Sequence, residues 1–146
     1  MREDIIRNKM TRILEIMESL DEYIPDDEDS FMNLGIIRDG IYKRLEYAIE
    51  NMFDICSIIN ADLKLGIPED ESNIVHNLVD YGVLSGEWST KLREIKAFRN
   101  ILVHRYGSID DKISFRILCE HLSDFTDFVN EIDGFLSDRN KETDEE

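Results

Sequence analysis

The sequence predicts an all-α fold, an antiparallel bundle of about five helices. Apolar residues recur at steps of three and four along most of the 146-residue chain, which is the period of an amphipathic helix. No strand-like alternation and no internal repeat interrupts this pattern, and only 2 Pro and 7 Gly are present to break helices. A chain of this length can bury roughly 70% of its unfolded surface, so it can form a core without a metal or a disulfide.

The N-terminal half is expected to form two helices joined by an acidic loop. The first helix should run from about Arg2 to Glu22, with apolar residues on one face. The acidic run Asp26–Asp29 then reads as a solvated loop, and docking of a basic partner is the less favoured alternative. The second helix should cover about Phe31 to Asp62, although Gly35 and Gly40 weaken its start, which could therefore lie later.

The C-terminal half is expected to contribute three more helices. A break at 66–68, Gly-Ile-Pro, should precede a short helix over about 71–81. A fourth helix should begin near residue 85 and end at Gly107, and a fifth should run to about Arg139. The sequence therefore predicts a helical domain over residues 1–139 and a disordered acidic tail over 140–146, which has no apolar residue.

The composition favours a cytoplasmic protein that does not enter a membrane. No apolar run approaches the roughly 18 residues of a membrane span, and the first residues do not resemble a signal peptide. Cys56 and Cys119 lie in apolar helical stretches and are expected as two buried thiols, with a disulfide as the less favoured alternative. Their spacing does not suggest zinc, so no metal and no cofactor is expected.

The formal net charge of −16 argues against general nucleic-acid binding, because Lys and Arg drive phosphate binding. A homodimer would carry twice that charge. Any RNA contact must therefore use a local basic patch against an unfavourable overall field. The alternative is that the excess of acidic residues maintains solubility or attracts a basic partner.

One arginine stands out in the fourth predicted helix. Its apolar stripe includes Trp88, Leu92, Ile95, Leu102 and Tyr106, and the position that completes it is Arg99. Arginine is almost never fully buried without a partner, because desolvating its charge alone is costly. Either a buried ion pair or a snorkelling side chain satisfies this arginine, or it serves a ligand.

His104 follows Arg99 by five residues, which on a regular helix turns the two side chains about 140° apart. The two groups can therefore converge only if the helix ends near Val103 or if a second copy of the chain completes the site. Gly107 favours an early helix end. A two-fold dimer would place two Arg–His sets around a shared groove.

The same segment is locally basic. Between residues 91 and 106 the sequence has one acid, Glu94, against the cations Lys91, Arg93, Lys96, Arg99 and Arg105. This is either an ordinary basic helix end, since cations favour helix C-termini, or a phosphate-binding patch.

The segment from Arg99 to Tyr106, Arg-Asn-Ile-Leu-Val-His-Arg-Tyr, resembles the R-x4-H-x-Y motif of HepT toxins in the HEPN superfamily. The resemblance extends to the helix layout of nearly the whole chain. It implies an endoribonuclease that acts as a homodimer without metal and leaves a 2′,3′-cyclic phosphate. By motif position, Arg99 and His104 would be catalytic and Asn100 would support them. Lys91, Arg93, Lys96 and Arg105 would form an RNA-binding patch.

The resemblance also implies a regulatory role for Tyr106. In HepT-like systems, assigned to type VII, a minimal nucleotidyltransferase (MNT) antitoxin transfers AMP to the motif tyrosine. The added phosphate would block RNA by repulsion and steric hindrance. A core tyrosine with a solvated hydroxyl is the alternative for this residue.

Three functions remain open on the sequence. The first is a ribonuclease toxin neutralised by a cognate nucleotidyltransferase. The second is a non-catalytic HEPN-like subunit that pairs with a nucleotidyltransferase and presents substrate or nucleotide, which the net charge favours. The third is a helical homodimer in which Arg99 is simply salt-bridged.

Overall fold

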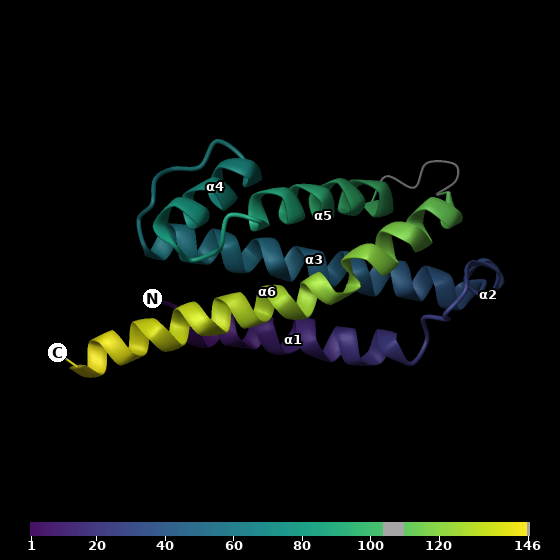
Figure 1. Cartoon of the computed structure of the whole chain (residues 1–146), viewed down its shortest axis with the longest axis horizontal. Helices are drawn as coiled ribbons and strands as arrows, with labels where there is room; N and C mark the ends of the chain where they lie inside the picture. Colours follow the sequence, from purple (N-terminus) through teal and green to yellow (C-terminus); the bar gives the residue numbers. More distant parts are fainter. Residues whose placement is uncertain (104–109, 146) are drawn as a thin grey trace.

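The computed structural model describes residues 1–103 and 110–145, and it confirms the predicted all-α class (Figure 1). The described residues form helices and connecting loops, with no strand among them. The helices are α1 (Glu3–Asp21), α2 (Glu28–Met32), α3 (Ile36–Asp62), α4 (Glu71–Tyr81), α5 (Trp88–Val103) and α6 (Asp111–Glu145).

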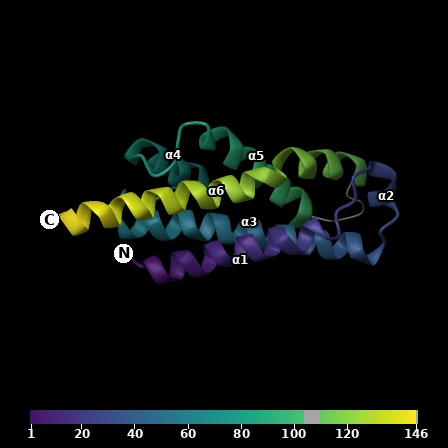
Figure 2. The same ribbon diagram turned by 60° about the horizontal axis from the view of Figure 1, so that its bottom comes forward.

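The central element of the bundle is α3, which contacts α1, α4, α5 and α6. Helices α1 and α6 also pack on each other. Helices α4 and α5 contact each other directly, and both pack on α3 (Figures 1 and 2). The two chain ends lie at the same end of the bundle, and α2 lies at the opposite end, where it contacts α6. This arrangement places α4 and α5 together as a pair, and the predicted site residues from Lys91 to Asn100 lie on α5.

The core is built from the apolar stripes that the sequence predicts. On α1, the residues Ile6, Ile13 and Leu20 are almost fully buried. On α5, Trp88 and Ile95 are equally buried. Burial of side chains of this size stabilises the fold by roughly 1.5–3 kcal/mol each relative to exposure. The bundle therefore rests on one continuous apolar core that holds α5 against α3.

The second predicted helix is in fact two, because the chain turns at Gly35. Gly35 has a φ of +60°, in the left-handed region that favours glycine, and it precedes α3. The short α2 before it is capped by Asp27, whose carboxylate accepts hydrogen bonds from the Ser30 backbone N–H at 2.9 Å and hydroxyl at 2.6 Å. The acidic loop predicted over Asp26–Asp29 is therefore shorter than expected, because Asp27 is a helix cap and Glu28 and Asp29 lie in the first turn of α2.

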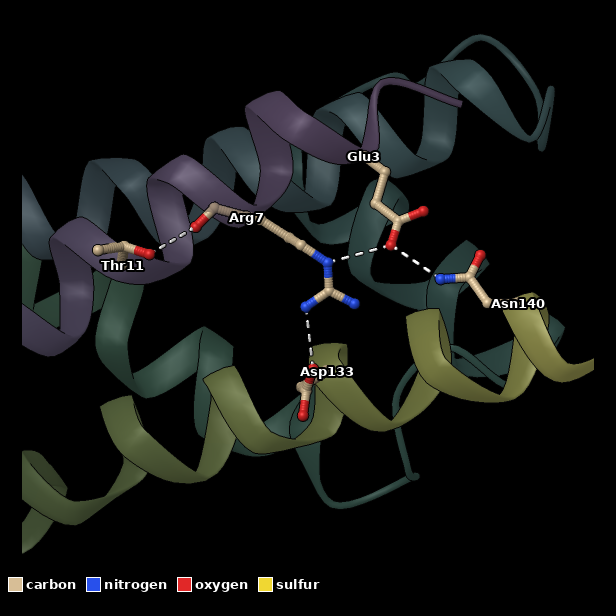
Figure 3. A network of polar contacts seen from close by, with 5 residues as sticks. All are labelled: Glu3, Arg7, Thr11, Asp133 and Asn140. Carbon is tan, nitrogen blue, oxygen red and sulfur yellow. Dashed lines mark hydrogen bonds and ion pairs between the residues drawn. The ribbon is translucent and has the colours of Figure 1, made fainter.

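The last helix is longer than predicted. It runs past Arg139 to Glu145, because neither Gly nor Pro follows Gly134 to end it. A polar network fastens this end of α6 to α1: the Glu3 carboxylate accepts hydrogen bonds from Arg7 and from Asn140, both at 3.0 Å (Figure 3). The predicted tail is therefore a continuation of α6 as far as the structure describes it.

At the other end of α6, Asp110 is the residue that caps the helix. Its Oδ1 accepts hydrogen bonds from the backbone N–H groups of Lys112 and Ile113, at 3.1 and 3.2 Å.

The two cysteines differ from each other. Cys56 is fully buried on α3, and burial raises the pKa of its thiol to about 12. Cys119 is exposed, which corrects the prediction of two buried thiols, and both cysteines are free. Within the described part of the chain, no helix combines the length and the apolarity needed to cross a bilayer.

Candidate functional site

The site begins at the N-terminus of α4. After the break at 66–68, Asp70 caps the helix by accepting a hydrogen bond from the Asn73 backbone N–H at 2.8 Å. The next residue, Glu71, is the first of the helix, where a negative charge is favourable beside the positive end of the helix dipole. The cap therefore fixes a carboxylate at the edge of α4 that faces α5.

Glu71 receives the guanidinium of Arg99 from α5. Two hydrogen bonds join them, from Nη1 to Oε2 at 3.0 Å and from Nη2 to Oε1 at 2.6 Å, which is the bidentate geometry of a strong charge-assisted pair. The Lys96 ammonium lies 3.9 Å from the same carboxylate. The Arg99 guanidinium also lies 5.0 Å from the ring centre of Phe53 on α3, within the range of a cation–π contact.

The pair is partly open to solvent. The Arg99 side chain is 17% exposed and the Glu71 side chain 30%. Hydrogen bonding from Arg99 holds the pKa of the Glu71 carboxyl below its usual range, and the same bond raises the pKa of Arg99. The ion-pair alternative raised by the sequence is thus realised. It does not occupy the whole guanidinium, which has further N–H donors beyond the two used here.

The structure separates the predicted basic patch into two parts. Lys96 and Arg93 lie on the side of α5 that faces α4, with Arg99. Lys91 instead faces α6: its ammonium is 3.6 Å from Asp124 and 4.8 Å from the ring centre of Trp88. Arg93 and Lys96 therefore share a surface with Arg99, whereas Lys91 belongs to the contact between α5 and α6.

The remaining predicted site residues follow or flank the end of α5. Asn100 is exposed on the helix, next to Arg99. His104, Arg105 and Tyr106 lie outside the described residues, so the convergence of His104 with Arg99 stays a prediction.

The sequence alone did not identify Glu71. A buried arginine demands a carboxylate, but the partner lies 28 residues away and the chain offers 33 acidic residues. The available signal was a cap followed by an acid, Asp70 and Glu71, directly after the Gly-Ile-Pro break. Only the packing of α4 on α5 shows which acid is the partner.

One group among the described residues has the composition of a metal site. Ligand atoms of Glu94, Glu120 and His121 lie within 4.8 Å of one another. The His121 ring is already held on both sides, by Asp124 at 2.8 Å from Nδ1 and by Glu94 at 3.2 Å from Nε2. His121 is therefore a satisfied histidine, and the group lies on the side of α5 that faces α6.

The all-α bundle and the motif arginine Arg99 on α5 are the two features on which the resemblance to HepT toxins rests. The comparisons agree, because the family model of ribonuclease HepT-like proteins matches residues 13–132. The chain belongs to this family, and its resemblance to HepT toxins is confirmed.

The chain is also similar to individual members of the family. It is 27% identical to the mRNA nuclease HepT of Shewanella oneidensis, over 88% of this chain and 96% of that protein. It also superposes with a TM-score of 0.79 on the tri-AMPylated Shewanella oneidensis HEPN toxin solved in complex with its MNT antitoxin, at 27% identity over 90% of this chain and 98% of that one. These relatives support the toxin function that the motif predicts.

A more distant structure shows the same fold. The cytosolic protein YutE from Bacillus subtilis, whose function is unknown, superposes with a TM-score of 0.80 at 19% identity, over 94% of this chain and 92% of that one. At this level of identity the likeness concerns the fold alone.

Proposed function

We propose that this protein is a metal-independent endoribonuclease toxin of a type VII HepT/MNT toxin–antitoxin system. The single observation that carries the proposal is the placement of Arg99, the first residue of the motif, on a carboxylate that fixes its orientation and uses two of its five N–H donors. Membership of the HepT-like family and the named activity of the Shewanella relative support it.

The reaction would be cleavage of RNA by its own 2′-hydroxyl. The 2′ oxygen attacks phosphorus, the 5′ oxygen of the next nucleotide leaves, and the product is a 2′,3′-cyclic phosphate. A proton must leave the 2′-hydroxyl and another must reach the departing oxygen. His104 is suited to move protons near neutral pH, and Arg99 to stabilise the negative charge that grows on the phosphoryl oxygens. Asn100 would orient the 2′-hydroxyl or one of these groups.

A homodimer would bring two motifs together. Because Arg99 and His104 point about 140° apart on a regular helix, a second protomer across a groove is one way to complete a site. Tyr106 would be the residue that the cognate MNT antitoxin modifies with AMP. A phosphate added there would repel the RNA backbone and occupy the space beside Arg99.

The experiment that tests the proposal measures RNA cleavage by the purified protein in EDTA. Mass spectrometry first establishes that the protein carries no AMP. We expect cleavage by the wild type that is lost in both Arg99→Ala and His104→Ala, with ends that carry a cyclic phosphate. Cleavage that disappears with EDTA, or that survives both substitutions, would overturn the assignment.

The alternative is a non-catalytic HEPN-like subunit that pairs with a nucleotidyltransferase and binds substrate or nucleotide. The net charge of −16 favours it, because that charge opposes RNA binding. In that case the AMP-free wild type would bind the nucleotidyltransferase and leave RNA intact.

A further inference from the structure

A cavity lies between α4 and α5, next to the Arg99–Glu71 pair. Its volume is about 250 Å³, and both helices contribute to its wall. Its polar lining consists of Glu71, Ser72, His76, Ser89, Arg93 and Lys96. An apolar floor is supplied in part by Phe53, the ring that also lies beside the Arg99 guanidinium. The cavity and the motif arginine are therefore parts of one continuous surface.

The lining of the cavity carries two cations, Arg93 and Lys96, and one carboxylate, Glu71. Lys96 and Arg99 share one carboxylate, that of Glu71. Arg93 forms no ion pair with any residue in the described ranges. His76 lies 3.2 Å from Asp80. In the lining itself, Arg93 and Lys96 face the one carboxylate of Glu71, while Glu50 and Asp70 lie close to the Arg99–Glu71 pair.

The cations follow the axis of α5 toward the end of the helix. Lys96 precedes Arg99 by three residues and neighbours it on the helix surface. Arg93 neighbours Lys96 in the same way, so it lies about 120° around the helix from Arg99 and about 9 Å from it along the axis. An RNA strand that contacts Arg99 can follow these cations into the cavity that Arg93 and Lys96 line.

We propose that this cavity is a subsite for RNA, in which Arg93 and Lys96 bind the backbone phosphate of a nucleotide that flanks the cleaved bond. The inference rests on the proposed ribonuclease function and deepens it. Contacts to phosphate are independent of base identity, so this subsite supplies affinity and register along the strand rather than sequence choice. The favourable contacts come from these two side chains and act against the unfavourable field of the whole protein.

The test measures binding of a short fluorescent single-stranded RNA by anisotropy at several salt concentrations. The proteins carry His104→Ala so that RNA stays intact, and Arg93→Ala and Lys96→Ala are added singly and together. Lys141→Ala is the charge-matched control, because its side chain is exposed at the C-terminal end of α6. Circular dichroism establishes that each variant is folded.

We expect the double variant to bind at least tenfold more weakly than its parent. The slope of log affinity against log salt should fall by about 0.7 for each phosphate contact removed, as single-stranded nucleic acids require. The Lys141→Ala control should keep the parent's affinity and slope. A double variant that matches the control in both quantities overturns the subsite.

Two further measurements separate this inference from the proposed function. If the AMP-free wild type cleaves RNA but Arg93 and Lys96 do not affect RNA binding, the subsite is wrong and the nuclease assignment stands. If the wild type neither cleaves nor binds RNA, both fail. If the double variant loses the nucleotidyltransferase partner in a pull-down but keeps its affinity for RNA, the cavity is a protein-docking surface and the subsite is again overturned.

Discussion

The carboxylate of Glu71, at the first position of α4, binds the guanidinium of Arg99 on α5 through two hydrogen bonds of 2.6 and 3.0 Å. This pair fixes α4 and α5 relative to each other at Arg99, the residue on which the proposed chemistry depends. The arginine is neither free in solvent nor sealed in the core, because 17% of its side chain is exposed. Both the stability of the fold and the proposed activity should respond to this pair.

Replacing Glu71 by Gln should lower the free energy of unfolding by about 1 to 2 kcal/mol at neutral pH. This value lies between the small contribution of an exposed pair and the large cost of breaking a buried one. Chemical denaturation measures it, with Glu69→Gln as the matched control, since Glu69 is exposed two residues earlier. An equal loss in both variants would contradict the role of the pair.

The difference in the free energy of unfolding between wild type and Glu71→Gln should decrease as the pH falls. The pKa of Glu71 is lowered in the folded protein by its bond to Arg99. The stabilisation is therefore complete above the ordinary carboxyl pKa of about 4.3 and is lost as the pH falls through the lower folded value. The stability difference between wild type and Glu71→Gln should shrink in acid. A difference that grows below pH 4 would show that the pair is not its source.

Two glycines of the α2–α3 region should respond to alanine with opposite signs. Gly35 has a φ of +60°, so Gly35→Ala should destabilise the fold by about 1 kcal/mol. Gly40 lies inside α3, and a Cβ there meets nothing within 4 Å. Gly40→Ala should therefore stabilise by roughly 0.5–1 kcal/mol through helix propensity. Thermal unfolding measures both, and equal effects would contradict the assigned backbone conformations.

The Asn60–Asn77 contact should fasten α4 to α3. The Asn77 amide donates to Asn60 Oδ1 at 3.0 Å, and Asn60, which is buried, donates to the Gly66 carbonyl at 3.0 Å. Asn77→Ala leaves a buried acceptor without this donor, and we expect a loss of about 1–3 kcal/mol. Asn130→Ala, an exposed change on α6, is the control. An unchanged unfolding midpoint for Asn77→Ala would mean that water replaces the donor without cost.

Modification should act through Tyr106. We expect AMP on this residue only when the neighbouring nucleotidyltransferase is present, and we expect the modified protein to lose RNA cleavage. Tyr106→Phe removes the acceptor hydroxyl, so this variant should not be modified. Peptide mapping by mass spectrometry locates the group. AMP on another residue, or full activity of the modified protein, would remove Tyr106 from the proposed regulation.

Much of the fold follows from the sequence because the apolar period is strong. The apolar stripes of α1, α3, α5 and α6 can be predicted from the spacing of apolar residues at steps of three and four. The burial of these residues confirms them. The division near Gly35 and the length of α6 were harder to predict. The turn at Gly35 depends on a positive φ, and the last turns of α6 are held by the hydrogen bond from Asn140 to Glu3 on another helix. Local patterns carry no information on such distant contacts.

The site shows the same limit. The unusual position of Arg99 could be recognised from the sequence, because a charged residue in an apolar stripe requires a partner. The identity of that partner, Glu71, depends on how α4 docks. Lys91 was grouped with Arg93 and Lys96 by proximity in the sequence, yet it faces the opposite neighbour of α5. The helical phase, rather than proximity along the chain, decides which cations share a surface.

The most direct test of a Glu71-anchored catalytic arginine is the rate of RNA cleavage under single-turnover conditions in EDTA. Wild type, Glu71→Gln and Glu69→Gln are compared after each is shown to be folded and free of AMP. We predict a rate at least tenfold lower for Glu71→Gln, because Arg99 loses its orientation, and a wild-type rate for Glu69→Gln. A Glu71→Gln protein that cleaves RNA as fast as the wild type would contradict the account.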